Sequence, residues 1–220
     1  MVTCYMCSKQ KTSVEHVPPL CLFPEKKEHS FQTNFRKNLI TVPSCDDHNS
    51  NKSKDDEYLR FVLVSHFENN SAAQTHFTGK VIRSLKRRPH ISETFMPDQL
   101  PAVLNGEQTM AFKVDLKRFN NGVSQICRGL YFEKYKEKWL DPIRVYSSCL
   151  LAQRSDKLTS AEEEFEIFRL AAEFFKDVIK EGENPEIFQY QMARFKDKMK
   201  SLHACYFMAV LRCFVFHPQN

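Results

Sequence analysis

Apolar residues in the N-terminal part of the chain recur at the spacing of an amphipathic helix. The pattern runs from Asp46 to about Glu68, with apolar positions at Tyr58, Phe61, Val62, Leu63 and Phe67. Asp46 and Asp47 suit the first turn of a helix, because the helix N-terminus favours negative charge. The polar run at 69–71 ends the pattern. We therefore predict a helix over residues 46–68.

The last third of the chain also has helical spacing. Ser160 and Glu163 are placed as a capping box. The apolar face that follows comprises Phe165, Phe168, Ala172, Phe175 and Ile179. Gly182 then ends this helix. Asn184 as a cap and Pro185 at the first helical position predict a further helix after it.

Strand patterns are shorter and lie in the first half of the chain. The apolar run at 38–42 is bounded by turn residues and predicts a strand. Residues 112–116 alternate between apolar and polar, which predicts a half-buried strand after the Asn105-Gly106 turn. A short amphipathic helix is expected over 123–135.

These elements predict an α+β protein with two parts. Residues 1–68 form a compact module of strands followed by a helix. Residues 69–220 form a mainly helical region with a few strands, and the C-terminal helices offer a surface for a protein partner or a second copy of the chain.

Composition indicates a soluble globular protein. The chain has 220 residues, of which 42% are hydrophobic and 27% charged, so it is neither disordered nor membrane-embedded in character. The longest apolar stretch, Ala204 to Phe216, is interrupted by Arg212 and is too short to span a bilayer. The first ten residues lack the pattern of a secretory signal. We expect a cytoplasmic protein that does not contact membranes and whose eight cysteines are reduced.

The formal charge of +5 is concentrated in one segment. Residues 61–150 carry thirteen basic against eight acidic side chains. Five of these cations fall within nine residues without an acid between them: Lys80, Arg83, Lys86, Arg87 and Arg88. Such a row can track a phosphate backbone, although charge runs also form solvated helix faces. No aromatic residue is interleaved, which argues against base stacking by this segment.

The cysteines divide into a paired group and a scattered group. Cys4 and Cys7 form a C-x-x-C pair, and Cys45 precedes His48 by three residues. Two such pairs can close a tetrahedral zinc site, and a chance coincidence of pairs is the alternative. The scattered cysteines are expected to be buried apolar side chains: Cys21, Cys127, Cys149, Cys205 and Cys213.

Other residues of the first fifty extend this pattern in a fixed order. Glu15 and His16 follow the first cysteine pair, Asn38 precedes Leu39 before the second, and Asn49 follows His48. In this order the sequence resembles the HNH endonucleases, a family with a ββα-metal active site and a zinc knuckle. The likeness covers about sixty residues, a little over a quarter of the chain.

The resemblance implies a role for each matching residue. His16 would be the general base, positioned by Asn38. Glu15 and Asn49 would hold a catalytic Mg²⁺ or Mn²⁺ ion, since both offer oxygen ligands. Lys52 would contact phosphate.

This sequence departs from the family at three of these positions. His48 stands where a fourth zinc cysteine is usual, so it is either a zinc ligand or a ligand of the catalytic ion. Glu15 replaces a common aspartate, and Asn49 replaces a common histidine.

The expected function is metal-dependent hydrolysis of phosphodiester bonds in nucleic acid, with DNA as the first choice of substrate. Two alternatives stay open. One is a non-catalytic zinc module that binds nucleic acid or protein, with the basic segment as its binding surface. The other is an effector subunit of a bacterial defence complex.

Overall fold

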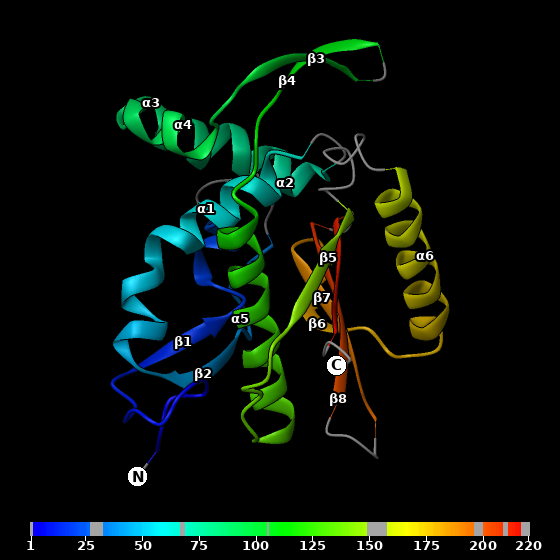
Figure 1. The fold of residues 1–220 in the computed structure, drawn as a ribbon. Coiled ribbons are helices and arrows are strands. Elements are labelled where there is room, and N and C mark those ends of the chain that lie inside the picture. The colour runs from blue at the N-terminus through cyan, green and yellow to red at the C-terminus, as the bar shows by residue number, and fades with distance from the viewer. Residues whose placement is uncertain are drawn as a thin grey trace.

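The first strands and helix of the chain pack together at one side of the molecule (Figure 1). The computed structural model describes residues 2–26, 33–66, 69–104, 106–148, 158–195, 200–208 and 211–216. Strands β1 (Ser13–Val17) and β2 (Ile40–Ser44) form an antiparallel pair in which His16 lies opposite Thr41. Two single 3-10 turns, η3 (Asp46–His48) and η4 (Ser50–Lys52), then lead into α1 (Ser53–Val64). The helix therefore begins at residue 53 and not at residue 46 as predicted. The strand predicted at 38–42 lies at 40–44.

Helix α5 (Leu116–Tyr135) is the central element on which the other parts pack. Its first turn is capped by Asp115, whose carboxylate accepts from the Arg118 N–H at 3.1 Å. The helix contains the segment predicted at 123–135 and begins seven residues earlier. It contacts α1, the β1–β2 pair and strands β5 (Arg144–Ser147) and β9 (Leu211–Phe216). Gly129 allows a close approach, because a Cβ there would lie 2.6 Å from Val17 Cγ2.

Short helices and a protruding hairpin connect α1 to α5. After the 3-10 turn η1 (Leu20–Leu22) and α1, the chain forms α2 (Ser71–His76), the π-helical turn η5 (Phe77–Val81), α3 (Ile82–Arg87) and α4 (Pro89–Phe95). Strands β3 (Leu100–Leu104) and β4 (Glu107–Ala111) form a hairpin that extends away from the body (Figure 1). Gly106 adopts φ +84° at its turn, as the Asn-Gly signal predicts; Asn105 itself lies outside the described residues.

A five-stranded antiparallel sheet occupies the C-terminal part of the chain. Its strand order is β5-β9-β8-β7-β6, with β6 at Glu181–Asn184, β7 at Phe188–Phe195 and β8 at Lys200–Phe207. Helix α6 (Leu158–Phe175) covers one face, where it packs on Leu202, Ala204 and Phe214. The alternate residues Cys205 and Val215 belong to the larger core on the α5 side.

The α+β class is therefore observed, but the region after residue 69 is not mainly helical. The helix predicted from Asn184 and Pro185 is wrong, because Asn184 ends β6 and residues 188–195 form β7. The local helix-start signal is overridden by pairing of β7 with β8 along eight residues. The apolar stretch at 204–216 is likewise strand and not helix, as far as it is described.

Two further sequence predictions are corrected. Residues 112–115 connect β4 to α5 without forming a strand, because the second strand of the hairpin lies earlier in the chain, at Glu107–Ala111. On α6 the predicted apolar face is rotated: Phe165 is 68% exposed, whereas Ala171 and Phe175 are buried against the sheet. The side chains of Ser160 and Glu163 lie outside the described residues, so the capping box stays a prediction.

One continuous apolar core joins the two parts that the sequence divides at residue 68. It includes Cys4 and Val17 from the first part and Phe119 and Cys213 from the second. Of the scattered cysteines, Cys127, Cys205 and Cys213 are buried as predicted, Cys21 is half-buried, and Cys149 lies outside the described residues. Among the described helices, none combines the length and the hydropathy needed to cross a membrane.

Candidate metal centre and basic hollow

Four side chains converge at one end of the β1–β2 pair, where the first residue of β1, Ser13, lies opposite the last residue of β2, Ser44. Cys4 and Cys7 come from the loop before β1, and Cys45 and His48 come from the turn after β2. All four potential ligand atoms lie within 4.8 Å of one another. The Sγ atoms of Cys7 and Cys45 are 3.8 Å apart, and His48 Nδ1 is 3.5 Å from Cys4 Sγ and 3.3 Å from Cys45 Sγ. The group could hold a metal ion, and it contains the residues that the sequence pairs predict.

Backbone hydrogen bonds fix the two ligand loops. The Cys4 N–H donates to the Lys9 carbonyl at 2.9 Å, which closes the first loop, and the Tyr5 N–H donates to the Pro43 carbonyl at 2.8 Å, which ties it to β2. The His48 N–H donates to the Cys45 carbonyl at 3.1 Å and shapes the second loop. Main-chain hydrogen bonds therefore help to position both ligand loops.

The pKa directions of Cys4 and His48 suit metal ligation, whereas that of Cys45 does not. Burial tends to raise the pKa of the Cys4 thiol, but hydrogen bonds, including one from the Met6 N–H at 3.4 Å, bring its pKa below the ordinary value. Burial lowers the pKa of His48, which favours the neutral imidazole that can donate a lone pair. Burial raises the pKa of Cys45.

Lys138 supports the metal cluster, and no pattern in the sequence indicates this role. Its Nζ donates to the Cys7 carbonyl at 2.6 Å and to Thr3 Oγ1 at 2.8 Å. The ammonium thus anchors the first ligand loop to the segment after α5. Only the tertiary fold brings residues 3, 7 and 138 together, so no local spacing could predict this contact.

A buried ion-pair network lies between the β1–β2 pair and α1. Lys52 Nζ is 2.6 Å from Glu15 Oε1 and 2.8 Å from Asp56 Oδ1, and the Lys52 and Glu15 side chains are only 7% and 5% exposed. Ser44 Oγ also donates to Glu15 Oε2 at 3.2 Å. The Lys52 ammonium therefore lies between two carboxylates, inside the module and away from the surface where it could meet phosphate.

The pKa directions of these three groups reflect the balance of burial and pairing. Burial raises the pKa of Glu15 and of Asp56 in spite of the nearby Lys52. The two carboxylates raise the pKa of Lys52 although its own burial acts in the opposite direction. The lysine therefore stays protonated and supplies the positive charge that the two acids need.

The structure separates Glu15 and His16. Consecutive strand residues point to opposite faces, and Glu15 is buried against α1 while His16 is half-buried. Asn38 is exposed and adopts φ +52°, a left-handed conformation that asparagine tolerates. Within the described part of the chain no hydrogen bond joins His16 to Asn38. Asn38 thus contributes to this structure through its backbone, which forms the left-handed turn before β2.

Asn49 also has a structural partner. Its Nδ2 donates to Ser13 Oγ at 2.9 Å and to the Val14 carbonyl at 3.2 Å, which ties the start of the helical segment to β1. Glu15 is meanwhile committed to Lys52. The residues expected to hold Mg²⁺ or Mn²⁺ therefore do not fit such an ion as they are arranged here, because a cation already neutralises the carboxylate.

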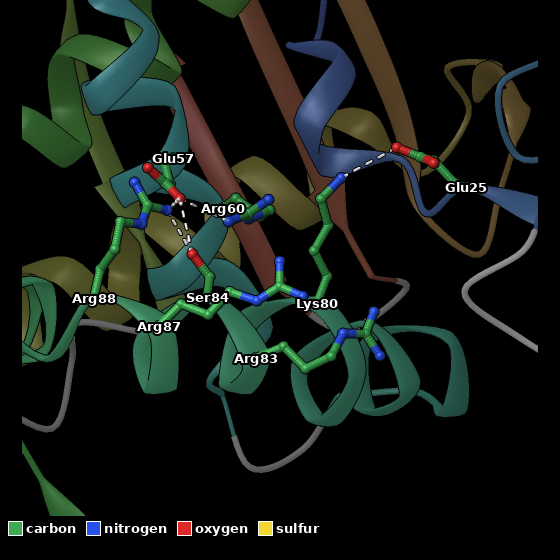
Figure 2. A pocket seen from close by; sticks show the side chains of 8 residues that line it. All are labelled: Glu25, Glu57, Arg60, Lys80, Arg83, Ser84, Arg87 and Arg88. Atoms are coloured by element: carbon green, nitrogen blue, oxygen red, sulfur yellow. Dashed lines mark hydrogen bonds and ion pairs between the residues drawn. The ribbon is translucent and has the colours of Figure 1, made fainter.

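The basic segment forms one wall of an open hollow of about 610 Å³ (Figure 2). The hollow is lined by side chains of η5, α3, α1 and the segment after η1: Glu25, Glu57, Arg60, Lys80, Arg83, Ser84, Arg87 and Arg88. Four of the five cations of the basic segment thus lie together, whereas the fifth, Lys86, is exposed outside the lining. Arg60, which sequence reasoning missed, joins them because it projects from α1.

Arg60 lines this hollow with a side chain that is almost completely buried. Its side chain is 5% exposed, its Nη2 is 3.4 Å from Glu57 Oε1, and its buried Nε has no hydrogen-bond partner. Arg88 Nη2 binds the same Glu57 oxygen at 2.6 Å, and Lys80 Nζ lies 3.4 Å from Glu25 Oε1. The helical spacing from Lys52 through Asp56 to Arg60 could have indicated that Arg60 shares the inner face of α1.

Comparison with known proteins adds no relative to this picture: no family model, no curated protein and no solved structure matches the chain.

Proposed function

We propose that residues 1–68 form a zinc-stapled nuclease module of the HNH type, which hydrolyses phosphodiester bonds in nucleic acid. The observation that carries the proposal is the meeting of Cys4, Cys7, Cys45 and His48 at the base of β1, β2 and α1. This is the order of strand, strand and helix that the resemblance implies, and His16 lies on its first strand.

Zinc is the metal that best suits the cluster. With Zn–S bonds of about 2.3 Å and a Zn–N bond of about 2.0 Å, a tetrahedral ion places two sulfurs about 3.8 Å apart and sulfur and nitrogen about 3.5 Å apart. The Cys7–Cys45 and Cys4–His48 separations of 3.8 and 3.5 Å agree with these values, and the Cys45–His48 separation of 3.3 Å is close to them. Three thiolates and an imidazole exclude the hard, oxygen-preferring ions, Mg²⁺ and Ca²⁺. In this assignment His48 completes the structural site.

His16 is the group assigned to the chemical step. A neutral imidazole accepts a proton from a water molecule as the water oxygen attacks phosphorus; the bond from phosphorus to the leaving oxygen breaks, and that oxygen takes up a proton from solvent water. His16 is half-buried and, among the described residues, bound to no hydrogen-bond partner, so its ring nitrogens are free for this contact. Since Glu15 and Asn49 are engaged elsewhere, no step is assigned to a divalent ion.

Plasmid cleavage tests the proposal. The wild-type chain, His16→Ala and the matched control Thr41→Ala are incubated with supercoiled plasmid, with Mg²⁺ or Mn²⁺ and without either. Thr41 faces His16 across the strand pair and is exposed, so it controls for disturbance of the strands. Nicked or linear product from wild type and Thr41→Ala, with a loss of at least about a hundredfold in His16→Ala, supports the assignment of a general base. Equal cleavage by all three chains contradicts it.

A second candidate function is a non-catalytic zinc module that binds nucleic acid. The observation that favours it is the pairing of Lys52 with Glu15, which occupies the carboxylate that a catalytic ion would need. This candidate gives salt-sensitive binding of DNA without cleavage under any of the metal conditions above. The plasmid assay and a binding titration on the same protein therefore separate the two.

A further inference from the structure

The basic hollow holds more cationic side chains than its own acids neutralise. Among the described residues its lining has five cations and two carboxylates, a formal excess of three positive charges. Glu57 is shared by Arg60, Arg88 and Ser84, and Glu25 lies near Lys80. Among the described residues neither Arg83 nor Arg87 has an ion pair. The hollow therefore has unused capacity for an anion.

The buried Arg60 distinguishes this hollow from an ordinary charged surface. Its guanidinium is almost completely buried beneath the hollow, and its Nε–H has no acceptor. A buried donor without a partner is unfavourable, and an anionic oxygen at this position would supply the missing acceptor. Figure 2 shows Arg60 at the side of the hollow that α1 forms, with Arg83, Arg87 and Lys80 on the facing helical segment.

The shape of the cationic row favours a strand over a compact anion. Lys80, Arg83 and Arg87 are spaced at three and four residues along η5 and α3, which places them on one face over roughly 10 Å of helix. That length exceeds a single phosphate group. Guanidinium groups bind phosphate oxygens in a bidentate manner, so the row can contact successive phosphates.

The described lining of the hollow offers no apolar surface to a base. None of its eight residues is aromatic or aliphatic, so a nucleotide would find no apolar slot for its base there. Stacking on aromatic rings, the usual means of holding single strands, is missing as well. Contacts limited to phosphate suit duplex nucleic acid, whose bases are paired and turned inward.

We propose that this hollow is a phosphate clamp for the backbone of duplex nucleic acid, with Arg60 at its buried side and Arg83 and Arg87 at its open side. The inference rests on the proposed function only in taking nucleic acid as the ligand. It adds Arg60 to the binding residues and excludes Lys86 from the clamp.

Salt-dependent binding tests the clamp without relying on catalysis. A fluorescent 20-base-pair duplex is titrated with the full-length chain in a His16→Ala background at several NaCl concentrations, and a gel verifies that the duplex stays intact. The variants are Arg83→Ala with Arg87→Ala, Arg60→Gln and Arg60→Lys. Lys86→Ala is the matched control, because it removes a charge from the same helix outside the hollow.

The expected result is a specific change in the salt dependence. The double variant lowers the slope of log Kobs against log salt by about two and weakens binding at least about tenfold. Arg60→Gln lowers the slope by about one, Arg60→Lys retains it, and Lys86→Ala leaves it unchanged. Thermal unfolding of each variant identifies any that fails to fold. If Arg60→Gln does not fold, the variants of the exposed Arg83 and Arg87 still decide the test.

Three results would overturn the clamp. The first is an equal slope change in Lys86→Ala and in the clamp variants, which indicates general surface charge. The second is direct binding of tripolyphosphate by a protein that shows no binding of the duplex. The third is wild-type affinity and an unchanged salt slope in the variant that combines Arg83→Ala with Arg87→Ala. Hollow-dependent binding together with no plasmid cleavage by the wild-type chain, in contrast, supports the clamp and refutes the nuclease.

Discussion

Lys52 Nζ lies 2.6 Å from Glu15 Oε1, so the acid of the Glu15-His16 pair is joined to an ammonium group and not exposed to solvent. Asp56 holds the same ammonium from the other side at 2.8 Å. The network lies where β1 packs on α1 and replaces the metal ligation that the sequence order implies. The network therefore ties the inner face of α1 to β1.

Removing the lysine should therefore destabilise the fold. Lys52→Met leaves two buried carboxylates without a counter-charge, and such a loss typically costs about 3–5 kcal/mol of unfolding free energy. Lys54→Met, at an exposed position in the first turn of α1, should change stability by less than about 0.5 kcal/mol. Urea unfolding of both variants measures the difference. Equal stability of the two would show that the Lys52 network is not a support of the module.

The close contact between α5 and β1 gives a second prediction. A Cβ on Gly129 would lie 2.6 and 2.9 Å from the two Cγ atoms of Val17, a branched side chain with little freedom to move. Gly129→Ala should cost about 1–3 kcal/mol through overpacking. At Gly122 on the same helix, the closest atom is the end of the flexible Leu59 side chain at 2.9 Å. Gain of helix propensity offsets that contact, so Gly122→Ala should be within about 0.5 kcal/mol of wild type. Thermal unfolding compares the pair, and the opposite ranking would contradict the described packing.

His203 should make the C-terminal part of the fold sensitive to acid. It is fully buried beside Tyr131 and Trp139, and burial lowers its pKa from 6.5 to about 3. Because the unfolded chain binds the proton more readily, the stabilising effect of the neutral ring is complete above pH 6.5 and is lost as the pH falls towards 3. The slope in that range is about 1.4 kcal/mol per pH unit.

Replacing this histidine should reduce the acid sensitivity. Unfolding free energies of wild type and His203→Phe are compared between pH 6.5 and 4.5, and the variant should lose less stability over that range. His90→Gln, at an exposed position, serves as the control and should retain the wild-type slope. Any titration of the metal ligands is common to all three chains and cancels in the comparison. Parallel curves for wild type and His203→Phe would exclude His203 as the source.

The metal cluster should be required for folding of the N-terminal module. Cys45→Ser removes a ligand that connects the end of β2 to the first loop, and structural zinc sites contribute about 10–16 kcal/mol of binding energy at neutral pH. We expect loss of bound zinc and early proteolysis within residues 2–66. Cys21→Ser, at a half-buried cysteine outside the cluster, should retain the metal. The assignment would be wrong if both variants kept the wild-type zinc content.

The cluster could be predicted from sequence because each ligand pair is held within one short loop. Cys4 with Cys7, and Cys45 with His48, have spacings set by local backbone geometry. The partners of Glu15 could not be predicted in this way, because they depend on which face of β1 packs on α1. Arg60 was missed for the same reason, since its place in the hollow depends on α3 packing against α1.

The C-terminal sheet shows where local signals fail. Asn184 and Pro185 have the residue types of a helix start, yet Asn184 donates from its side chain to the Lys37 carbonyl at 3.2 Å and ends β6. The strand at 188–195 is stabilised by pairing with residues 200–207, which no window of local sequence contains. Short apolar runs of this kind are compatible with either helix or strand until their partners are known.

X-ray absorption at the zinc edge of the purified full-length chain is the most direct test of the metal centre on which this account depends. We predict one zinc per chain with three sulfur ligands at about 2.3 Å and one nitrogen ligand at about 2.0 Å. His48→Ala should remove the nitrogen contribution while Cys4, Cys7 and Cys45 retain theirs. A zinc coordinated mainly by oxygen, or a nitrogen contribution that persists in His48→Ala, would contradict the assignment of His48 and the cluster at the base of the module.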